Sequence, residues 1–303
     1  DSFREAILEH FRFNLRQMVD LAWDHGIDVV FIHPASNIQD FSPFKSEHGS
    51  SLSEDERARF ESLYGEGREL MKLEDFEGAL ERFEAAAELS SEFADLHYRT
   101  GRCALALDRV EEAETHLVLA KELDVCPLRS LEPMNLDLVK LARERSVPMV
   151  EFESRLKQES RRRRDHGILG GEDFLDHVHP RIEVHQKLAE WIAETLVEQG
   201  WVAVHKRLTA EDRRALYEHH LGALDPAYFA QRDLNLGKVL GWAGKNEEAA
   251  AAFERAAAVM SEDPMVHYNL GIVYQKLGRF EEALSRYRET ISQAPGFSEA
   301  HFN

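Results

Sequence analysis

The residues of this chain best suited to chemistry lie in the run Phe174-Leu175-Asp176-His177-Val178-His179-Pro180. Asp176 and His179 stand three residues apart, in a turn that ends in proline and leads into an amphipathic helix. A carboxylate that orients an imidazole makes it a general base, and the two groups form two thirds of a Ser-His-Asp triad. The sequence contains neither Gly-Asp-Ser nor Gly-x-Ser-x-Gly, the usual mounts for a nucleophilic serine. We therefore predict Asp176 and His179 as catalytic residues whose nucleophile is missing from these 303 residues.

Two other roles for the same run stay open. Asp176 could cap the following turn, with His179 as a packed surface histidine. Asp176, His177 and His179 could instead ligate a metal, but no third, well-spaced His/Glu or Cys pair accompanies them. The sequence therefore predicts no metal and no cofactor.

Composition limits the possible partners. Charged residues make up 31% of the chain and hydrophobic residues 43%, which is typical of a globular protein. A formal net charge of −19 disfavours nucleic acid and anionic membrane surfaces as partners. The basic run Arg161 to Arg164 is interpreted as a solvated face, with anion binding as the alternative. No apolar stretch approaches the length needed to span a membrane.

The cysteines and the chain ends bear on the cellular compartment. Cys103 and Cys126 are too few for a disulfide framework, so both are expected to be reduced, which favours the cytoplasm. The chain opens at Asp1 without a signal peptide and ends at Asn303 in mid-pattern, so both ends look like cuts in a longer protein. A signal or anchor could precede Asp1, and the localisation therefore stays open.

Small and aromatic residues recur with a period of 34 in two parts of the chain. In the first part Gly67, Ala79, Phe83 and Ala86 return as Gly101, Ala113, Leu117 and Ala120. In the second part Gly237, Ala249, Phe253 and Ala256 return as Gly271, Ala283, Tyr287 and Thr290. Each unit resembles a tetratricopeptide repeat, two antiparallel helices that approach closely at small residues. Stacked repeats of this kind create a groove that binds a peptide or a neighbouring protein.

A different pattern surrounds the first repeats. Ile27 to His33 and Val147 to Phe152 are short apolar runs that predict buried parallel strands. Helical periodicity covers Phe3 to His25, Leu131 to Arg145 and Ile182 to Gln199. The fold class we predict is α/β plus all-α, a partial doubly wound parallel-sheet domain with helical repeats inserted and appended.

This order predicts five segments. They are a first part of the α/β domain (1–50), an inserted repeat pair (51–125), the last part of the α/β domain (126–201), a helical connector with a helix from Glu211 to His220 (202–229), and C-terminal repeats (230–303).

Polar residues follow the first predicted strand. Asn37, Lys45 and His48 lie in the loop that leaves its carboxyl end, where active sites of open α/β sheets gather. They are candidate substrate-binding residues, and for Lys45 and His48 a solvated loop is the alternative. His219 and His220 have no spaced partners and are interpreted as surface residues.

Several segments together carry a family resemblance: Ala35-Ser36-Asn37, Ser42 to His48, Cys126-Pro127-Leu128-Arg129 and Phe174 to Pro180. They are similar to the later half of SGNH/GDSL hydrolases with built-in tetratricopeptide repeats, over about residues 3–50 and 126–200. The resemblance implies that His179 is the general base and Asp176 its orienting partner. The family's serine, glycine and asparagine blocks have no match in this chain, and Asn37 is not assigned the family's oxyanion role.

Two functions from different classes are consistent with these features. The first is a fragment of a serine-type ester hydrolase or acyltransferase, fused to repeats that bind a protein or peptide. Its ester-containing substrate belongs to the full-length parent, and this chain alone should show little or no esterase turnover. The alternative is a non-catalytic repeat scaffold for protein interaction, with a relic α/β domain.

Overall fold

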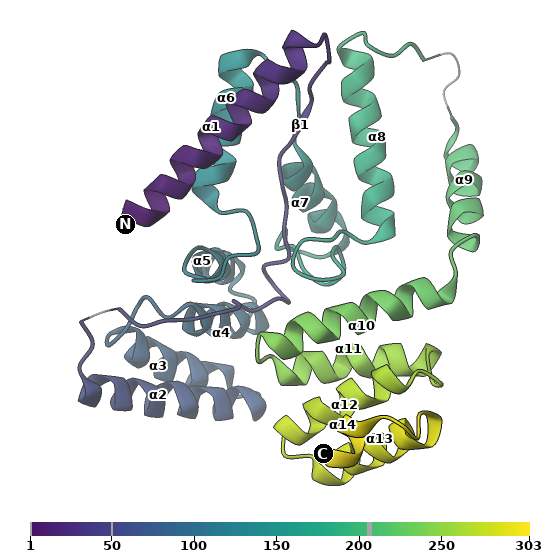
Figure 1. The fold of residues 1–303 in the computed structure, drawn as a ribbon. Coiled ribbons are helices and arrows are strands. Elements are labelled where there is room, and N and C mark those ends of the chain that lie inside the picture. The colour runs from purple at the N-terminus through teal and green to yellow at the C-terminus, as the bar shows by residue number, and fades with distance from the viewer. Residues whose placement is uncertain (1, 50, 205–207) are drawn as a thin grey trace. The chain divides into compact units, whose positions relative to one another are not determined.

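The computed structural model describes residues 2–49, 51–204 and 208–303. The chain divides into two compact units, Asp1–His205 and Lys206–Asn303, which are described separately. The described residues form fourteen helices and two short strands, so the fold is mostly helical (Figure 1). The sequence predicts the repeats, but it predicts a larger sheet than the two-stranded one in the structure.

The inserted repeats of the first unit are two antiparallel helix pairs. Their helices are α2 (Glu54–Lys72), α3 (Phe76–Ala87), α4 (Ala94–Ala106) and α5 (Val110–Glu122). Gly67 lets the first pair close, because a Cβ there would lie 2.5 Å from the buried ring of Phe83. Gly101 has the same role against Leu117, at 2.7 Å. The 34-residue recurrence of glycine is therefore a steric requirement of helix packing.

A two-stranded parallel sheet lies between two helix pairs in the rest of the first unit. Its elements are α1 (Ser2–Asp24), β1 (Phe31–Ile32), α6 (Glu132–Arg145), β2 (Met149–Val150), α7 (Phe152–Arg163) and α8 (Ile182–Glu198). Phe31 pairs with Met149 and Ile32 with Val150. Because successive strand side chains point to opposite faces, Phe31 packs with Val19 and Leu141, whereas Val150 packs with Leu156 and Phe174.

The predicted extent of the strands is wrong. The expected runs of 27–33 and 147–152 shorten to two residues each, and no further strand of the described chain joins them. A strand exists only where a neighbour completes the hydrogen-bond ladder, and β1 and β2 pair over two residues. The doubly wound sheet expected from the sequence is thus reduced to one strand pair with helices on its faces.

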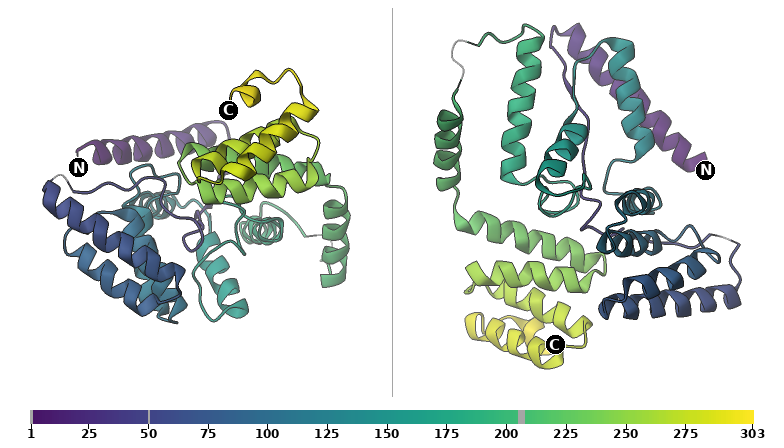
Figure 2. Two further views of the ribbon diagram at one scale, coloured as in Figure 1. Left: turned by 90° about the horizontal axis from the view of Figure 1, so that it is seen from below. Right: turned by 180° about the vertical axis from the view of Figure 1, so that it is seen from behind.

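The second unit contains the C-terminal repeats. Its helices are α9 (Ala210–Gly222), α10 (Pro226–Trp242), α11 (Asn246–Val259), α12 (Pro264–Lys276), α13 (Phe280–Gln293) and α14 (Ser298–Phe302) (Figure 2). Gly237 and Gly271 each face an aromatic ring, and an added Cβ would lie 2.6 Å from Phe253 or Tyr287. None of the helices in the described ranges has the length and apolarity that a membrane crossing requires.

Candidate functional site

The structure brings Asp176 and His179 together. His179 Nδ1 lies 2.7 Å from Asp176 Oδ2, and the backbone N–H groups of Val178 and His179 donate to Asp176 Oδ1 at 2.9 and 2.8 Å. The His179 side chain is 71% exposed, whereas that of Asp176 is 16% exposed. The carboxylate therefore fixes one ring nitrogen of an imidazole that is otherwise open to solvent.

The same contacts set the charge of Asp176. Burial by itself raises the pKa of this carboxyl group, but the N–H donors of His179 and Val178 and the His179 ring outweigh it. The pKa of Asp176 consequently lies below its ordinary value. An ionised carboxylate is the form that holds an imidazole by its Nδ1–H and leaves Nε2 able to accept a proton.

The turn that carries the pair is closed at its base. Phe174 and Pro180 form an antiparallel bridge, and the N–H of Leu175 donates to the carbonyl of His179 at 2.8 Å. Just before the turn lies Asp173, whose side chain is fully buried.

Two arginines neutralise that buried charge. Arg163 and Arg164 reach Asp173 at 2.5 and 2.6 Å. Arg161, Arg162 and Arg163 are exposed, as the interpretation of a solvated face expects, whereas the Arg164 side chain is only 13% exposed. Asp173, the partner of Arg163 and Arg164, follows them by ten and nine residues in the sequence. Its burial results from tertiary packing.

Asn37 lies beside this turn but has a structural contact of its own. Its N–H donates to the carbonyl of His177 at 3.0 Å, which joins the end of β1 to the turn. Its side-chain oxygen accepts from the N–H of Asp40 at 2.8 Å, and the residue is buried. The prediction that Asn37 contacts a substrate stays a prediction.

Lys45 and His48 lie in a different environment. Lys45 is exposed and pairs with Glu47 at 2.5 Å. His48 packs on the rings of Phe93 and Phe60 at 4.7 and 4.6 Å. Its Nδ1 lies 3.0 Å from Ser90 Oγ. These contacts place His48 among the repeats, and the structure does not bring it together with the Asp176–His179 pair.

The contacts of His48 are part of a longer association. Residues 39–48, which we call the strap, run along one face of α4 (Figure 1). Tyr98 Oη and Arg102 Nη1 donate to the carbonyl of Gln39 at 3.1 and 2.9 Å. Arg102 also pairs with Asp40 at 2.7 Å.

At the start of α4 the strap is held again. The N–H of Asp95 donates to Ser46 Oγ at 2.8 Å. Asp95, Tyr98 and Arg102 are spaced by three and four residues, so they share one face of the helix. The repeats of the first unit therefore hold a non-helical segment of the same chain. Sequence reasoning missed this association because the contacts join residues far apart in sequence.

One of these three positions recurs in the second unit as the same residue type, Tyr98 as Tyr268, whereas Asn235 and Asn269 occupy the positions of Gly65 and Arg99. Tyr268 precedes Gly271 by three residues, as Tyr98 precedes Gly101. Asn235 and Asn269 each lie two residues before the glycine of their repeat, and Asn303 follows Asn269 by one further period of 34. Asn235 is exposed and Asn269 is half-buried.

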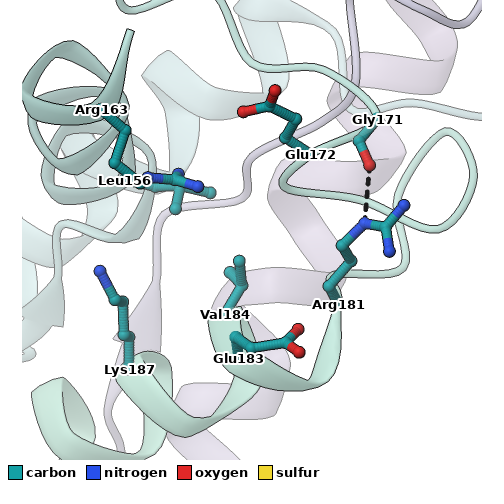
Figure 3. Close-up of a pocket in the computed structure, with 8 residues that line it drawn as sticks. All are labelled: Leu156, Arg163, Gly171, Glu172, Arg181, Glu183, Val184 and Lys187. Carbon is teal, nitrogen blue, oxygen red and sulfur yellow. Dashed lines mark hydrogen bonds between the residues drawn. The ribbon is translucent and has the colours of Figure 1, made fainter.

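A pocket of about 500 Å³ lies next to the turn that carries Asp176 (Figure 3). Arg163, Arg181 and Lys187 line it together with two glutamates. Arg181 Nε donates to the carbonyl of Gly171 at 2.7 Å, and Lys187 pairs with Glu159 at 2.6 Å. The charges around this pocket are thus largely compensated by the protein itself.

The described residues contain no cluster of three or more His, Cys, Asp or Glu side chains arranged to hold a metal ion. His177, the third member of the suggested metal set, instead contacts the rings of Phe41 and Phe44 at 5.0 and 5.5 Å.

Both repeat regions match a known protein family. Residues 64–122 and residues 229–295 each match the tetratricopeptide repeat family, and neither match is to a hydrolase family. No curated protein matches the chain. The SGNH-type resemblance of the remaining segments therefore has no support from these comparisons.

Among solved structures, proteins with tetratricopeptide repeats resemble this chain weakly. YrrB, described as a tetratricopeptide-repeat protein with an unusual peptide-binding site, has 15% identity and a TM-score of 0.23, covering 79% of this chain and 89% of that one. A thermophilic tetratricopeptide-repeat protein of Thermus thermophilus has 16% identity and a TM-score of 0.23, covering 80% and 95%. The TPR2AB-domain:pHSP90-complex of yeast Sti1 has 17% identity and a TM-score of 0.25, covering 81% of each chain.

Proposed function

We propose that this chain, which has tetratricopeptide repeats in both of its units, is an interaction scaffold whose second unit binds an extended peptide. The observation that supports it best is the strap, because in it the repeats of the first unit hold a segment without helix or strand structure. α4 holds the strap partly through a main-chain carbonyl, that of Gln39, which any peptide also offers.

The second unit repeats one strap-holding position, since Tyr268 lies where Tyr98 lies in the first unit, and it adds two amide side chains nearby. We define its proposed binding face by Asn235 on α10 and by Tyr268 and Asn269 on α12. A carboxamide donates through its NH₂ and accepts through its oxygen, so it can pair with the N–H and C=O groups of a peptide main chain. Residues at the same position of successive repeats lie in a row, which suits an extended ligand.

The similar proteins support the same class of function. The names of YrrB and of the Sti1 complex refer to a peptide-binding site and to a bound pHSP90 partner. The charge of this chain, −19, adds a preference for basic peptides through long-range attraction.

The proposal is tested with a displayed library of random dodecapeptides selected on the whole chain. The affinity of a selected peptide is then measured by fluorescence anisotropy for the wild type and for the double variant Asn235→Ala/Asn269→Ala. We expect the double variant to bind at least about tenfold more weakly, because it loses contacts at the centre of the face. Asn14→Ala, an exposed amide on α1, is the matched control and should leave the affinity unchanged. Unchanged affinity in the double variant would refute the proposed face.

A second function is favoured by the geometry of Asp176 and His179. We infer that the pair is the orienting acid and general base of an ester hydrolase or acyltransferase. On this hypothesis residues 1–50 and 126–201 belong to one enzyme domain, into which the repeats of 51–125 are inserted. The sequence of this chain has no Gly-Asp-Ser or Gly-x-Ser-x-Gly segment, so we expect little or no turnover of p-nitrophenyl acetate by it.

The proton arrangement of His179 tests the base assignment without turnover. Long-range ¹H–¹⁵N NMR should show the neutral imidazole protonated at Nδ1 and bare at Nε2, because Asp176 accepts from Nδ1. Asp176→Asn should shift the ring towards the other tautomer. An Nε2-protonated ring in the wild type would contradict the assignment, since Nε2 could then not act as base.

A further inference from the structure

A second cavity of about 430 Å³ lies where β1 ends, and neither proposed function uses it. Its apolar lining includes Ile32, Phe152, Val178 and Leu188. Its polar lining includes Ser36, Lys121 and Asn135. The size and the mixture of a large apolar wall with a few polar groups are typical of small-molecule sites.

Lys121 is the unusual member of this lining. It lies on α5, in the second repeat, and only 7% of the residue is exposed. Buried lysines are rare unless an acid neutralises them. The acid here is Glu122, at 3.3 Å.

Glu122 is shared among several donors. It also pairs with Arg4 at 3.2 Å and accepts from the N–H of Glu132 at 2.9 Å. One carboxylate thus serves two cations, so Lys121 shares its counter-ion with Arg4. An ammonium has three N–H donors, so a ligand acceptor can be accommodated as well.

The neighbouring polar groups of the lining act as donors too. Ser130 Oγ donates to Asn135 Oδ1 at 2.5 Å, so the Asn135 side chain has its NH₂ group available for donation. Ser36 adds a hydroxyl group. The carboxylate of the lining, Glu153, is engaged by Lys157 at 3.1 Å and by His33 at 3.4 Å.

From this lining we propose that the cavity binds a small carboxylate with an apolar tail. Lys121 is the counter-ion of the carboxylate, and the tail lies against Phe152, Val178 and Leu188. The proposal does not depend on peptide binding by the second unit, and the cavity adjoins the Asp176–His179 turn, to which Val178 of the lining belongs.

Hexanoate is the probe, with the whole chain as the protein and calorimetry and saturation-transfer NMR as readouts. Hexanoate should bind saturably, and hexanamide and hexylamine should bind at least about tenfold more weakly, because neither presents an anion to Lys121. Acetate should also bind more weakly because it has no tail to bury. Hexylamine binding as tightly as hexanoate would overturn the proposal.

Two variants and a control complete the test. Lys121→Met keeps the apolar stem and should weaken hexanoate at least about tenfold. Lys140→Met, an exposed lysine on α6, should change nothing. Ser36→Leu fills the cavity from its half-buried edge and should abolish binding even if Lys121→Met does not fold. Unchanged affinity in Ser36→Leu would refute the site.

Discussion

Asp176 combines a structural and a chemical contact in one carboxylate. One oxygen accepts from two backbone N–H groups and so fixes the turn, and the other oxygen accepts from the ring of His179. Because the first contact holds the second in place, the orientation of the imidazole depends on the fold of the turn. A residue of this kind should also affect stability, with a dependence on pH.

We predict that Asp176 stabilises the first unit above about pH 4 and ceases to do so in acid. Its folded pKa lies below the ordinary value of 3.8, so the stabilisation is complete above the unfolded pKa and is lost as pH falls through the folded pKa. The difference in unfolding free energy between wild type and Asp176→Asn should therefore shrink below pH 4.

Urea unfolding between pH 3 and 7 measures this difference. A Trp242→Phe background confines the tryptophan signal to the first unit, where Trp23, Trp191 and Trp201 remain. A difference that does not vary over the whole range would show that the carboxylate is not stabilised in the folded state.

Sequence reasoning works at this scale when the interacting residues are close along the chain. Asp176 and His179 are three residues apart, and their pairing follows from local turn geometry. His48 is a substrate-binding candidate from the sequence because its loop follows the first predicted strand. The sequence does not show that Phe60 of α2 and Phe93, just before α4, pack against it. Its loop position was visible in the sequence, but its neighbours were not.

The helix pairs and the sheet differ in how much local sequence determines them. A repeat closes through a contact such as Gly67 with Phe83, which lies within one helix pair, and the recurrence of small residues therefore predicted it. The strands depend on partners far away in sequence. Ile27 has the side chain of a strand residue, but it is 58% exposed and lies outside the ladder that Phe31 and Ile32 form with β2.

Gly67→Ala and Gly65→Ala form a matched pair on α2. A Cβ at position 67 would lie 2.5 Å from the buried ring of Phe83, so we expect a loss of about 1–3 kcal/mol in unfolding free energy. A Cβ at position 65 meets nothing within 4 Å, so the higher helix propensity of alanine should add about 0.5–1 kcal/mol. Chemical denaturation of both variants measures these changes, and equal effects would mean that close packing does not require Gly67.

Arg102→Ala should loosen the strap from α4. The variant loses the contacts with the Gln39 carbonyl and with Asp40, so local opening of the strap should become more frequent. Trypsin cleavage after the exposed Lys45 should then be several-fold faster, measured as the fragment that begins at Ser46. Arg82→Ala, which removes a surface ion pair with Glu66, is the control. Cleavage at an unchanged rate would indicate that the strap is held by other contacts.

At the scale of the whole chain, the two repeat regions differ in whether a segment of the chain already covers the helix face that could bind a ligand. In the first unit one face of α4 is covered by the strap, which also contacts the turn of Asp176 through the rings of Phe41 and His177. In the second unit the residues of the proposed face are exposed or half-buried, and Asn235 and Asn269 occupy the same position of two successive repeats. A peptide ligand should therefore bind to the second unit, although both regions match the same family.

Amide hydrogen exchange of the whole chain with a library-selected peptide tests this central claim most directly. We predict slower exchange in α10 and α12 when the peptide is bound, with α2 and α4 unchanged. The Asn235→Ala/Asn269→Ala variant should show no such protection at the same peptide concentration. Protection confined to α2 and α4 would contradict the account, because it would mean that the ligand displaces the strap and binds to the first repeat pair.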